Sequence, residues 1–146
     1  MTSADGERFD VIIRNGILID GTGAPRRQAD LAIAGGRIQA MGELAGASAD
    51  QTIQASGRVV APGFIDVHTH DDRVLLSDPA MTPKVSQGVT TVVVGNCGIS
   101  LAPFTPHGRP IPPLDLLGDA AWYRFSTFAA FIDAVERTPA AVNAVF

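Results

Sequence analysis

Two histidines separated by one residue, His68 and His70, follow a short apolar segment and precede the carboxylates Asp71 and Asp72. Residues two apart in an extended chain point to the same side, so both imidazoles can reach one cation. Neutral imidazole is a good ligand for zinc and similar ions. Paired loop histidines are usually just solvated. However, the sequence contains only three histidines, and few shuffled sequences would place two of them at this spacing. The pattern therefore predicts a metal site.

Other polar residues lie near this pair in the sequence. Asp66 precedes the histidines by two residues and is expected to share their side of the strand. Asp71 and Asp72 lie close enough to contact the histidine rings. We nevertheless expect both to be solvated loop carboxylates. The third histidine, His107, lies in a Pro/Gly-containing loop and is also expected to be solvated.

The single cysteine, Cys97, follows a run of mostly β-branched residues, 89–94, which predicts a strand buried on both faces. A lone cysteine is by default an inert buried side chain. Here Gly95 and Gly98 lie close to it, and it ends a strand as the histidine pair does. If the two strands are parallel, the thiol and the imidazoles emerge at the same end. They could then converge on adjacent metal positions.

The elements that would position these residues change in type near residue 62. Residues 9–61 contain short alternating segments separated by the turn signals Asn15-Gly16, Gly35-Gly36 and Ser56-Gly57. They predict an all-β region built from hairpins. This region could be a self-contained small domain or part of a larger one.

Residues 62–146 alternate strand and helix patterns, which indicates a parallel α/β sheet. The predicted strands cover residues 64–67, expected to be buried, 89–94 and 141–146. One helix is predicted from Thr82-Pro83 to Gly88. A second, amphipathic helix is capped by Ser126 or Thr127 and ends before Pro139.

Composition restricts the classes of protein to consider. The chain has 146 residues, a net charge of −4 and no basic cluster, which argues against a nucleic-acid partner. No run approaches the ~18 apolar residues of a membrane span. Residues 1–8 are polar and read as a disordered lead-in without a secretory signal. With a single cysteine and no such signal, a cytoplasmic location is the default expectation.

The two motifs resemble those of a known family. Residues 62–70, with the pattern PGFID-x-H-x-H, resemble the first barrel strand of the amidohydrolase superfamily. Residues 88–98 resemble the second strand of its N-acyl-D-amino-acid deacylase (D-aminoacylase) branch. The resemblance implies a (β/α)8 TIM-like barrel preceded by part of a small β-sandwich. It also implies a hydrolase that uses Zn2+ to cleave the amide bond of a small-molecule N-acyl-D-amino acid.

The resemblance further implies roles for the candidate ligands. Cys97 matches the cysteine that binds the tightly held zinc together with two histidines from later strands. His68 and His70 match the pair at a second, weaker metal position. The general-base aspartate is expected beyond residue 146. A complete barrel needs ~250 residues, whereas 84 residues run from Gly63 to the end. We therefore expect an N-terminal piece with about three barrel strands, and one that is inactive by itself.

Two alternatives remain. A cyclic-amide hydrolase of the dihydropyrimidinase or hydantoinase type shares the first motif. Those enzymes use a carboxylated lysine from a later strand, and a metal-ligating cysteine after the second strand is not typical of them. The chain could also be a non-catalytic truncated product or a subunit completed by a second polypeptide.

Overall fold

The computed structural model of the protein describes residues 8–146, and within them the chain divides into two compact units after Pro62. The expected lead-in, 1–8, falls mainly on residues outside this described part. Its last residue, Arg8, already begins the first strand. The structure is of the mixed α/β type, with β-strands throughout and few helices.

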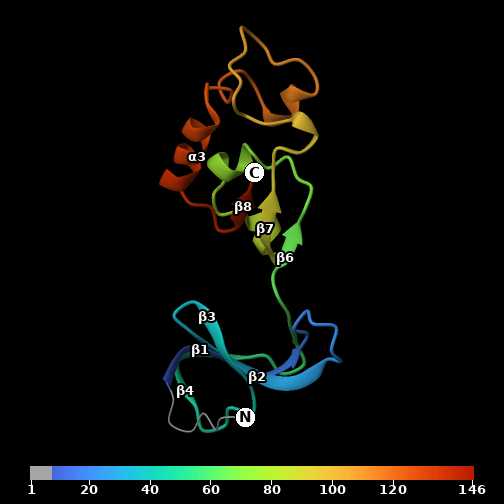
Figure 1. Cartoon of the computed structure of the whole chain (residues 1–146), viewed down its shortest axis with the longest axis vertical. Coiled ribbons are helices and arrows are strands. Elements are labelled where there is room, and N and C mark those ends of the chain that lie inside the picture. Colours follow the sequence, from blue (N-terminus) through green and yellow to red (C-terminus); the bar gives the residue numbers. More distant parts are fainter. Residues whose placement is uncertain (1–7) are drawn as a thin grey trace. The chain divides into compact units, whose positions relative to one another are not determined.

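The first unit is a five-stranded sheet in the order β3-β2-β1-β4, with β5 also paired to β1 (Figure 1). The long strand β1 is antiparallel to β2 and parallel to both β4 and β5. The strands are β1 (Arg8–Leu18), β2 (Arg27–Ala34), β3 (Arg37–Gly42), β4 (Ser48–Gln54) and β5 (Val59–Val60).

The three predicted hairpin turns had different outcomes. The turn at Gly35-Gly36 is confirmed and joins the antiparallel strands β2 and β3. The prediction of a turn at Asn15-Gly16 is wrong, because β1 continues through these residues with an irregularity in its pairing to β2. Asn15 has a φ of 59°, and a Cβ on Gly16 would lie 2.5 Å from Val60 Cγ2. The Asn-Gly pair therefore makes a bulge that lets the backbone approach β5 closely.

The pair predicted around Ser56-Gly57 is also wrong. The strands on either side, β4 and β5, do not pair with each other but both pair with β1. The residues of the turn favour a hairpin, but β4 and β5 each pair with the long strand β1 instead of with each other.

One ion pair connects three parts of the first unit. The guanidinium of Arg14 lies 2.8 Å from Asp30 Oδ2 and also donates to the carbonyl oxygens of Leu44 and Ala47. Asp30 Oδ1 accepts the backbone N–H of Asn15 at the bulge. Strands β1 and β2 and the 44–47 segment are thus joined by charge-assisted hydrogen bonds.

The second unit contains the predicted parallel sheet, in the order β6-β7-β8 (Figure 1). Its strands are β6 (Phe64–Asp66), β7 (Val89–Val93) and β8 (Asn143–Val145). The helices are α1 (Val74–Ser77), α2 (Thr82–Val85) and α3 (Phe128–Arg137), and the 3-10 turns are η1 (Asn96–Gly98) and η2 (Leu114–Leu117). The predicted cap of α3 is present, because Thr127 Oγ1 accepts the N–H of Ala130.

The expectation that residues 64–67 are buried is wrong. Phe64, Ile65 and Val67 are 62%, 61% and 69% exposed, because no part of the described chain packs over them. The expectation that the 89–94 strand is buried on both faces is also wrong, because within β7 only Val92 is buried, where it packs among the second unit's core side chains. That core cluster comprises Leu75, Met81, Val92, Val94 and Val142.

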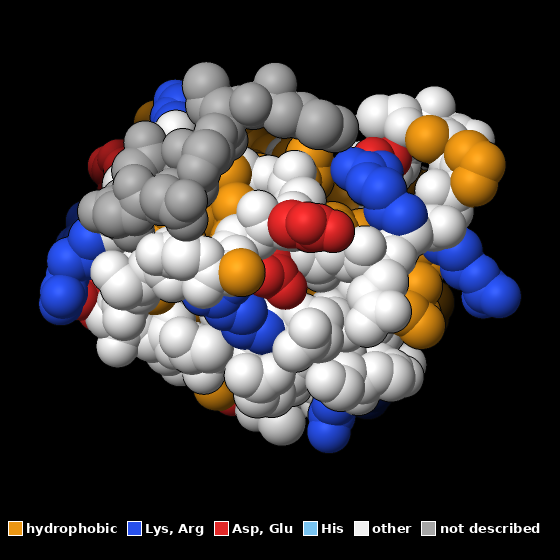
Figure 2. Space-filling model, turned by 90° about the horizontal axis from the view of Figure 1, so that it is seen from below, with side chains coloured by type: hydrophobic (Ala, Val, Ile, Leu, Met, Phe, Trp, Pro, Cys, Tyr) orange, Lys and Arg blue, Asp and Glu red, His pale blue; other side chains and the backbone are white. Residues whose placement is uncertain are grey.

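Surface charge and hydropathy add two observations. Acidic and basic side chains are interspersed over the face that Figure 2 shows, with no large patch of one sign. Within residues 8–146, no helix has the length and apolar character needed to cross a bilayer.

We expect Asp30→Asn to destabilise the protein at neutral pH. Burial raises the Asp30 pKa, but the Asn15 N–H and the Arg14 guanidinium outweigh it and hold that pKa below its ordinary value. The carboxylate therefore contributes stability above the ordinary carboxyl pKa, and this contribution is lost as pH falls through the folded-state pKa. Urea unfolding followed by circular dichroism should show that the substitution lowers the free energy of unfolding by about 1–3 kcal/mol at pH 7. This difference should become smaller towards pH 3.

The matched control is Asp50→Asn. Asp50 pairs with Arg8 at the surface, and 59% of its side chain is exposed. We therefore expect the free energy of unfolding to change by less than ~0.5 kcal/mol. Equal effects of the two substitutions at pH 7 would contradict a special role for Asp30.

Candidate metal centre

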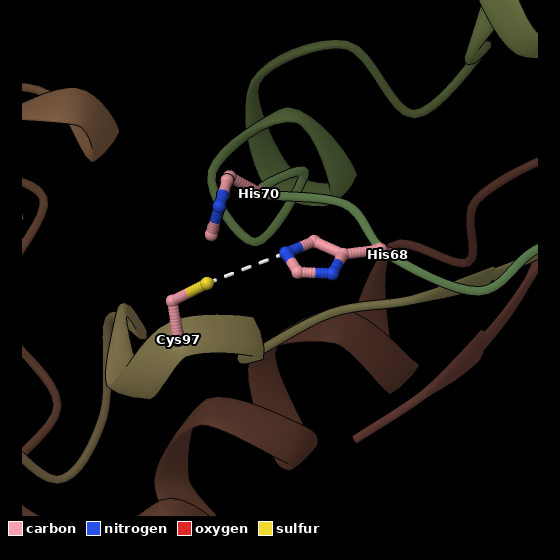
Figure 3. A group of neighbouring side chains, drawn as sticks. All are labelled: His68, His70 and Cys97. Atoms are coloured by element: carbon pink, nitrogen blue, oxygen red, sulfur yellow. Dashed lines mark hydrogen bonds between the residues drawn. The ribbon is translucent and has the colours of Figure 1, made fainter.

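The structure brings together the three residues proposed from the sequence as metal ligands. One ligand atom from each of His68, His70 and Cys97 lies within 4.8 Å of the other two. Cys97 Sγ is 3.3 Å from His68 Nε2, and the two histidine rings meet edge-on with centroids 5.6 Å apart. Figure 3 shows the three side chains pointing into one shared space, the histidines from the loop after β6 and the cysteine from η1.

The pairing of β6 with β7 explains why these side chains meet. The strands are parallel, and Asp66 pairs with Val92, so the residues after each strand emerge at the same edge. The backbone N–H of Thr69 continues the contact beyond β6 and donates to the carbonyl oxygen of Val93 at 3.0 Å. The histidine loop and the cysteine turn therefore start from adjacent points.

Side-chain hydrogen bonds then hold the two loops together. Thr69 Oγ1 donates to the Val93 carbonyl at 3.1 Å, and the Asn96 side chain donates to the same oxygen at 2.9 Å. Asp72 Oδ2 accepts the N–H of Gly95 at 3.2 Å. Thr69 and Asp72 are the only buried polar residues in the part of the chain that the structure describes.

The expectation that Asp72 is solvated is therefore wrong. Its side chain is fully buried, and burial raises its pKa, opposed mainly by the hydrogen bond from Gly95. A buried carboxyl group is costly unless it has partners. Oδ2 has a partner in the Gly95 N–H, which links the histidine loop to the turn that carries Cys97, whereas Oδ1 is buried without a hydrogen-bond partner.

Cys97 itself has an unusual backbone conformation. Its φ of 59° and ψ of 16° are left-handed, between Gly95 and Gly98, which are also left-handed. For a residue other than glycine this conformation costs about 1–2 kcal/mol. Cys97 is exposed, so the default of an inert buried cysteine does not apply. Strain of this kind is concentrated at functional sites, where surrounding contacts enforce it.

Asp66 and Asp71 do not belong to the group of three and are ion-paired with Lys84 instead. Lys84 Nζ lies 2.8 Å from Asp66 Oδ2 and 2.9 Å from Asp71 Oδ2. The Lys84 hydrogen bond is the main cause that lowers the Asp66 pKa. Burial lowers the Lys84 pKa, but its two carboxylate partners outweigh this and raise it. The solvated state expected for Asp71 is wrong, whereas His107 is exposed as expected.

The motifs used for the sequence analysis did not point to Lys84. Its rarity is a signal that could have pointed to it, because the sequence contains a single lysine and ten arginines.

The donors fit a transition-metal ion. Nδ1 of His70 is buried and has no hydrogen-bond partner, which is rare for a polar atom in a folded protein. Two ligands on a tetrahedral zinc lie about 3.5 Å apart, close to the sulfur–nitrogen distance seen here. Imidazole and thiolate suit zinc and related ions rather than calcium or magnesium.

Comparisons with known proteins agree with the motifs. The sequence profile of the amidohydrolase family matches residues 51–143. A D-aminoacylase of Alcaligenes xylosoxydans xylosoxydans is 56% identical over 144 residues, which are 99% of this chain and 30% of that protein. The chain thus spans less than a third of this relative.

Two solved structures are similar as well. One is a D-aminoacylase with a binuclear metal centre, with a TM-score of 0.88 and 54% identity, covering 93% of this chain and 28% of that one. The other is N-acyl-D-glutamate deacylase from Bordetella bronchiseptica, complexed with zinc and a phosphonate inhibitor that mimics the tetrahedral intermediate. Its TM-score is 0.87 and its identity 47%, over 95% of this chain and 29% of that one.

We expect Asp72→Ala to loosen the turn that carries Cys97. The Gly95 N–H loses its acceptor, so its protection from hydrogen exchange should fall by at least about tenfold. The substitution should also cost about 1–3 kcal/mol of unfolding free energy. Exchange of this amide can be followed by NMR.

Asp78→Ala is the control, because Asp78 is an exposed carboxylate in the same region. It should leave Gly95 exchange within about twofold. Unchanged Gly95 exchange in a folded Asp72→Ala protein would mean that the buried carboxylate does not hold the turn.

Proposed function

Because this chain belongs to the amidohydrolase family, we propose that it provides metal-binding residues of an enzyme that hydrolyses the amide bond of N-acyl-D-amino acids with the help of zinc. The products would be a carboxylate and a free D-amino acid. The observation that carries the proposal is the convergence of His68, His70 and Cys97 within 4.8 Å at one end of two parallel strands.

The architecture proposed for the whole protein follows from the same strands. In the second unit, β6, β7 and β8 would be the first three strands of a (β/α)8 barrel, since they are parallel and adjacent in chain order. The first unit would be part of a small β-sandwich. Barrel enzymes place their chemistry at the carboxyl ends of the strands, and both candidate ligand groups lie there.

Each residue of the site has a proposed role. His68, His70 and Cys97 would hold the metal, which when bound supplies a nucleophilic water at neutral pH and polarises the substrate carbonyl. Thr69 and Asp72 keep the two ligand-bearing loops in register. None of the described residues is assigned as the general base.

The thiol favours the deacylase reaction over cyclic-amide hydrolysis. Sequence similarity supports this choice, since the D-aminoacylase of Alcaligenes is 56% identical over nearly the whole chain. Zinc is supported by the N-acyl-D-glutamate deacylase structure, which contains that metal, and by the sulfur donor, which zinc accepts readily.

A chimeric enzyme tests the function. Residues 1–146 would replace the matching segment of the Alcaligenes D-aminoacylase. With zinc, we expect release of D-amino acids from N-acetyl-D-amino acids and none from the L-enantiomers. Cys97→Ala in the chimera should lower kcat/KM by at least about 100-fold, because a metal ligand is lost.

His107→Ala is the control, because this exposed histidine lies outside the group of three and its loss should leave turnover unchanged. A folded, zinc-loaded chimera that turns over only cyclic amides, or nothing, would reject the proposed reaction. Full activity of the Cys97→Ala chimera would reject the role of the thiol.

A further inference from the structure

Lys84 contacts the carboxylates of Asp66 and Asp71. In the sequence, these two residues stand on either side of the histidine pair. Asp66 precedes His68 by two residues, and Asp71 directly follows His70. The Lys84 ammonium, carried by α2, reaches Oδ2 of both carboxylates at 2.8 and 2.9 Å. One cation from a separate element therefore binds both ends of the segment that carries the two histidines.

The choice of lysine at this position is informative. The chain has ten arginines and one lysine. A guanidinium is a planar fork that matches a single carboxylate, whereas an ammonium is compact and can direct separate donors to two acceptors. The three side chains are only 22%, 35% and 18% exposed for Lys84, Asp66 and Asp71, so solvent screens these contacts less than those of a surface pair.

The two carboxylates would otherwise be available to a metal. Aspartate oxygens are themselves zinc ligands, and they are preferred by harder ions such as Mn2+. Asp66 and Asp71 adjoin the histidines in the chain, so only a local rearrangement would bring one of them to the ion. In the structure, Oδ2 of each is ion-paired with Lys84, and neither residue belongs to the group of three candidate ligands.

We propose that Lys84 is a positioning residue of the metal centre, which fixes both ends of the histidine segment and keeps Asp66 and Asp71 away from the ion. The inference rests on the metal site of the proposed function. Its consequence is selectivity: the site presents two imidazoles and a thiolate, and it discriminates against metals that prefer oxygen. Loss of Lys84 would weaken the histidine positioning that zinc needs and release oxygen ligands that Mn2+ prefers.

The test compares the 146-residue chain with its Lys84→Gln variant. Competition with a chromophoric chelator gives the affinities for Zn2+ and Mn2+, and the absorption spectrum of bound Co2+ reports coordination number. We expect the ratio of zinc to manganese affinity to fall at least about tenfold. The cobalt d–d bands should weaken as an oxygen ligand joins.

Two further variants separate this role from general effects of charge. Arg109→Gln removes the same charge from an exposed position and should change the affinity ratio by less than about twofold. The triple variant Lys84→Gln, Asp66→Asn, Asp71→Asn contains no released carboxylate and should regain the cobalt spectrum of the unaltered chain. If Lys84→Gln does not fold, acetylation of this single lysine in the folded protein neutralises the same ammonium.

The outcomes distinguish the two proposals. An unaltered chain that binds neither Zn2+ nor Co2+ would overturn the metal site and this inference together. Normal binding with an unchanged affinity ratio and cobalt spectrum after loss of the Lys84 charge would overturn only the role of Lys84. An equal shift in Arg109→Gln would do the same.

Discussion

The candidate metal centre depends on the parallel pairing of β6 with β7. That pairing places the residues after Asp66 beside those after Val93, so that a histidine loop and a cysteine turn leave the sheet at the same edge. A slip by one residue would turn the side chains of β6 to the opposite face. Hydrogen bonds from Thr69 to Val93 extend the contact past the last paired residues and hold the register where the ligands begin.

The site is assembled from costly features that support one another. Cys97 has a left-handed backbone, Asp72 is a fully buried carboxyl group, and His70 has a buried ring nitrogen without a partner. The bond from Asp72 to Gly95 helps to enforce the turn that strains Cys97. The unpartnered nitrogen of His70 is the feature that a bound ion could satisfy directly. Their coincidence at one sheet edge argues for a functional rather than a structural origin.

The donor set also narrows the chemistry within the family. Two imidazoles alone would be compatible with several amidohydrolase branches, and the thiol that follows β7 is the feature on which the proposed deacylase reaction depends. The acidic residues next to the histidines do not belong to this group of three: Asp66 and Asp71 are paired with Lys84, and Asp72 accepts the Gly95 N–H with Oδ2. The negative charge of Asp66 and Asp71 beside the site is therefore balanced by Lys84, which belongs to α2 rather than to the loops that carry the candidate ligands.

The sequence by itself determined the features that depend on local patterns: the candidate ligands His68, His70 and Cys97, the hairpin at Gly35-Gly36, a helix cap at Ser126 or Thr127 and the parallel sheet of the second unit. Only the tertiary structure decided features that depend on distant partners. Asn15-Gly16 became a bulge because β2 and β5 pair along β1, and Phe64 and Val67 are exposed because no described residue covers them. Asp72 and Lys84 acquired their partners through contacts between segments separated in sequence, and local propensity contains no information about such contacts.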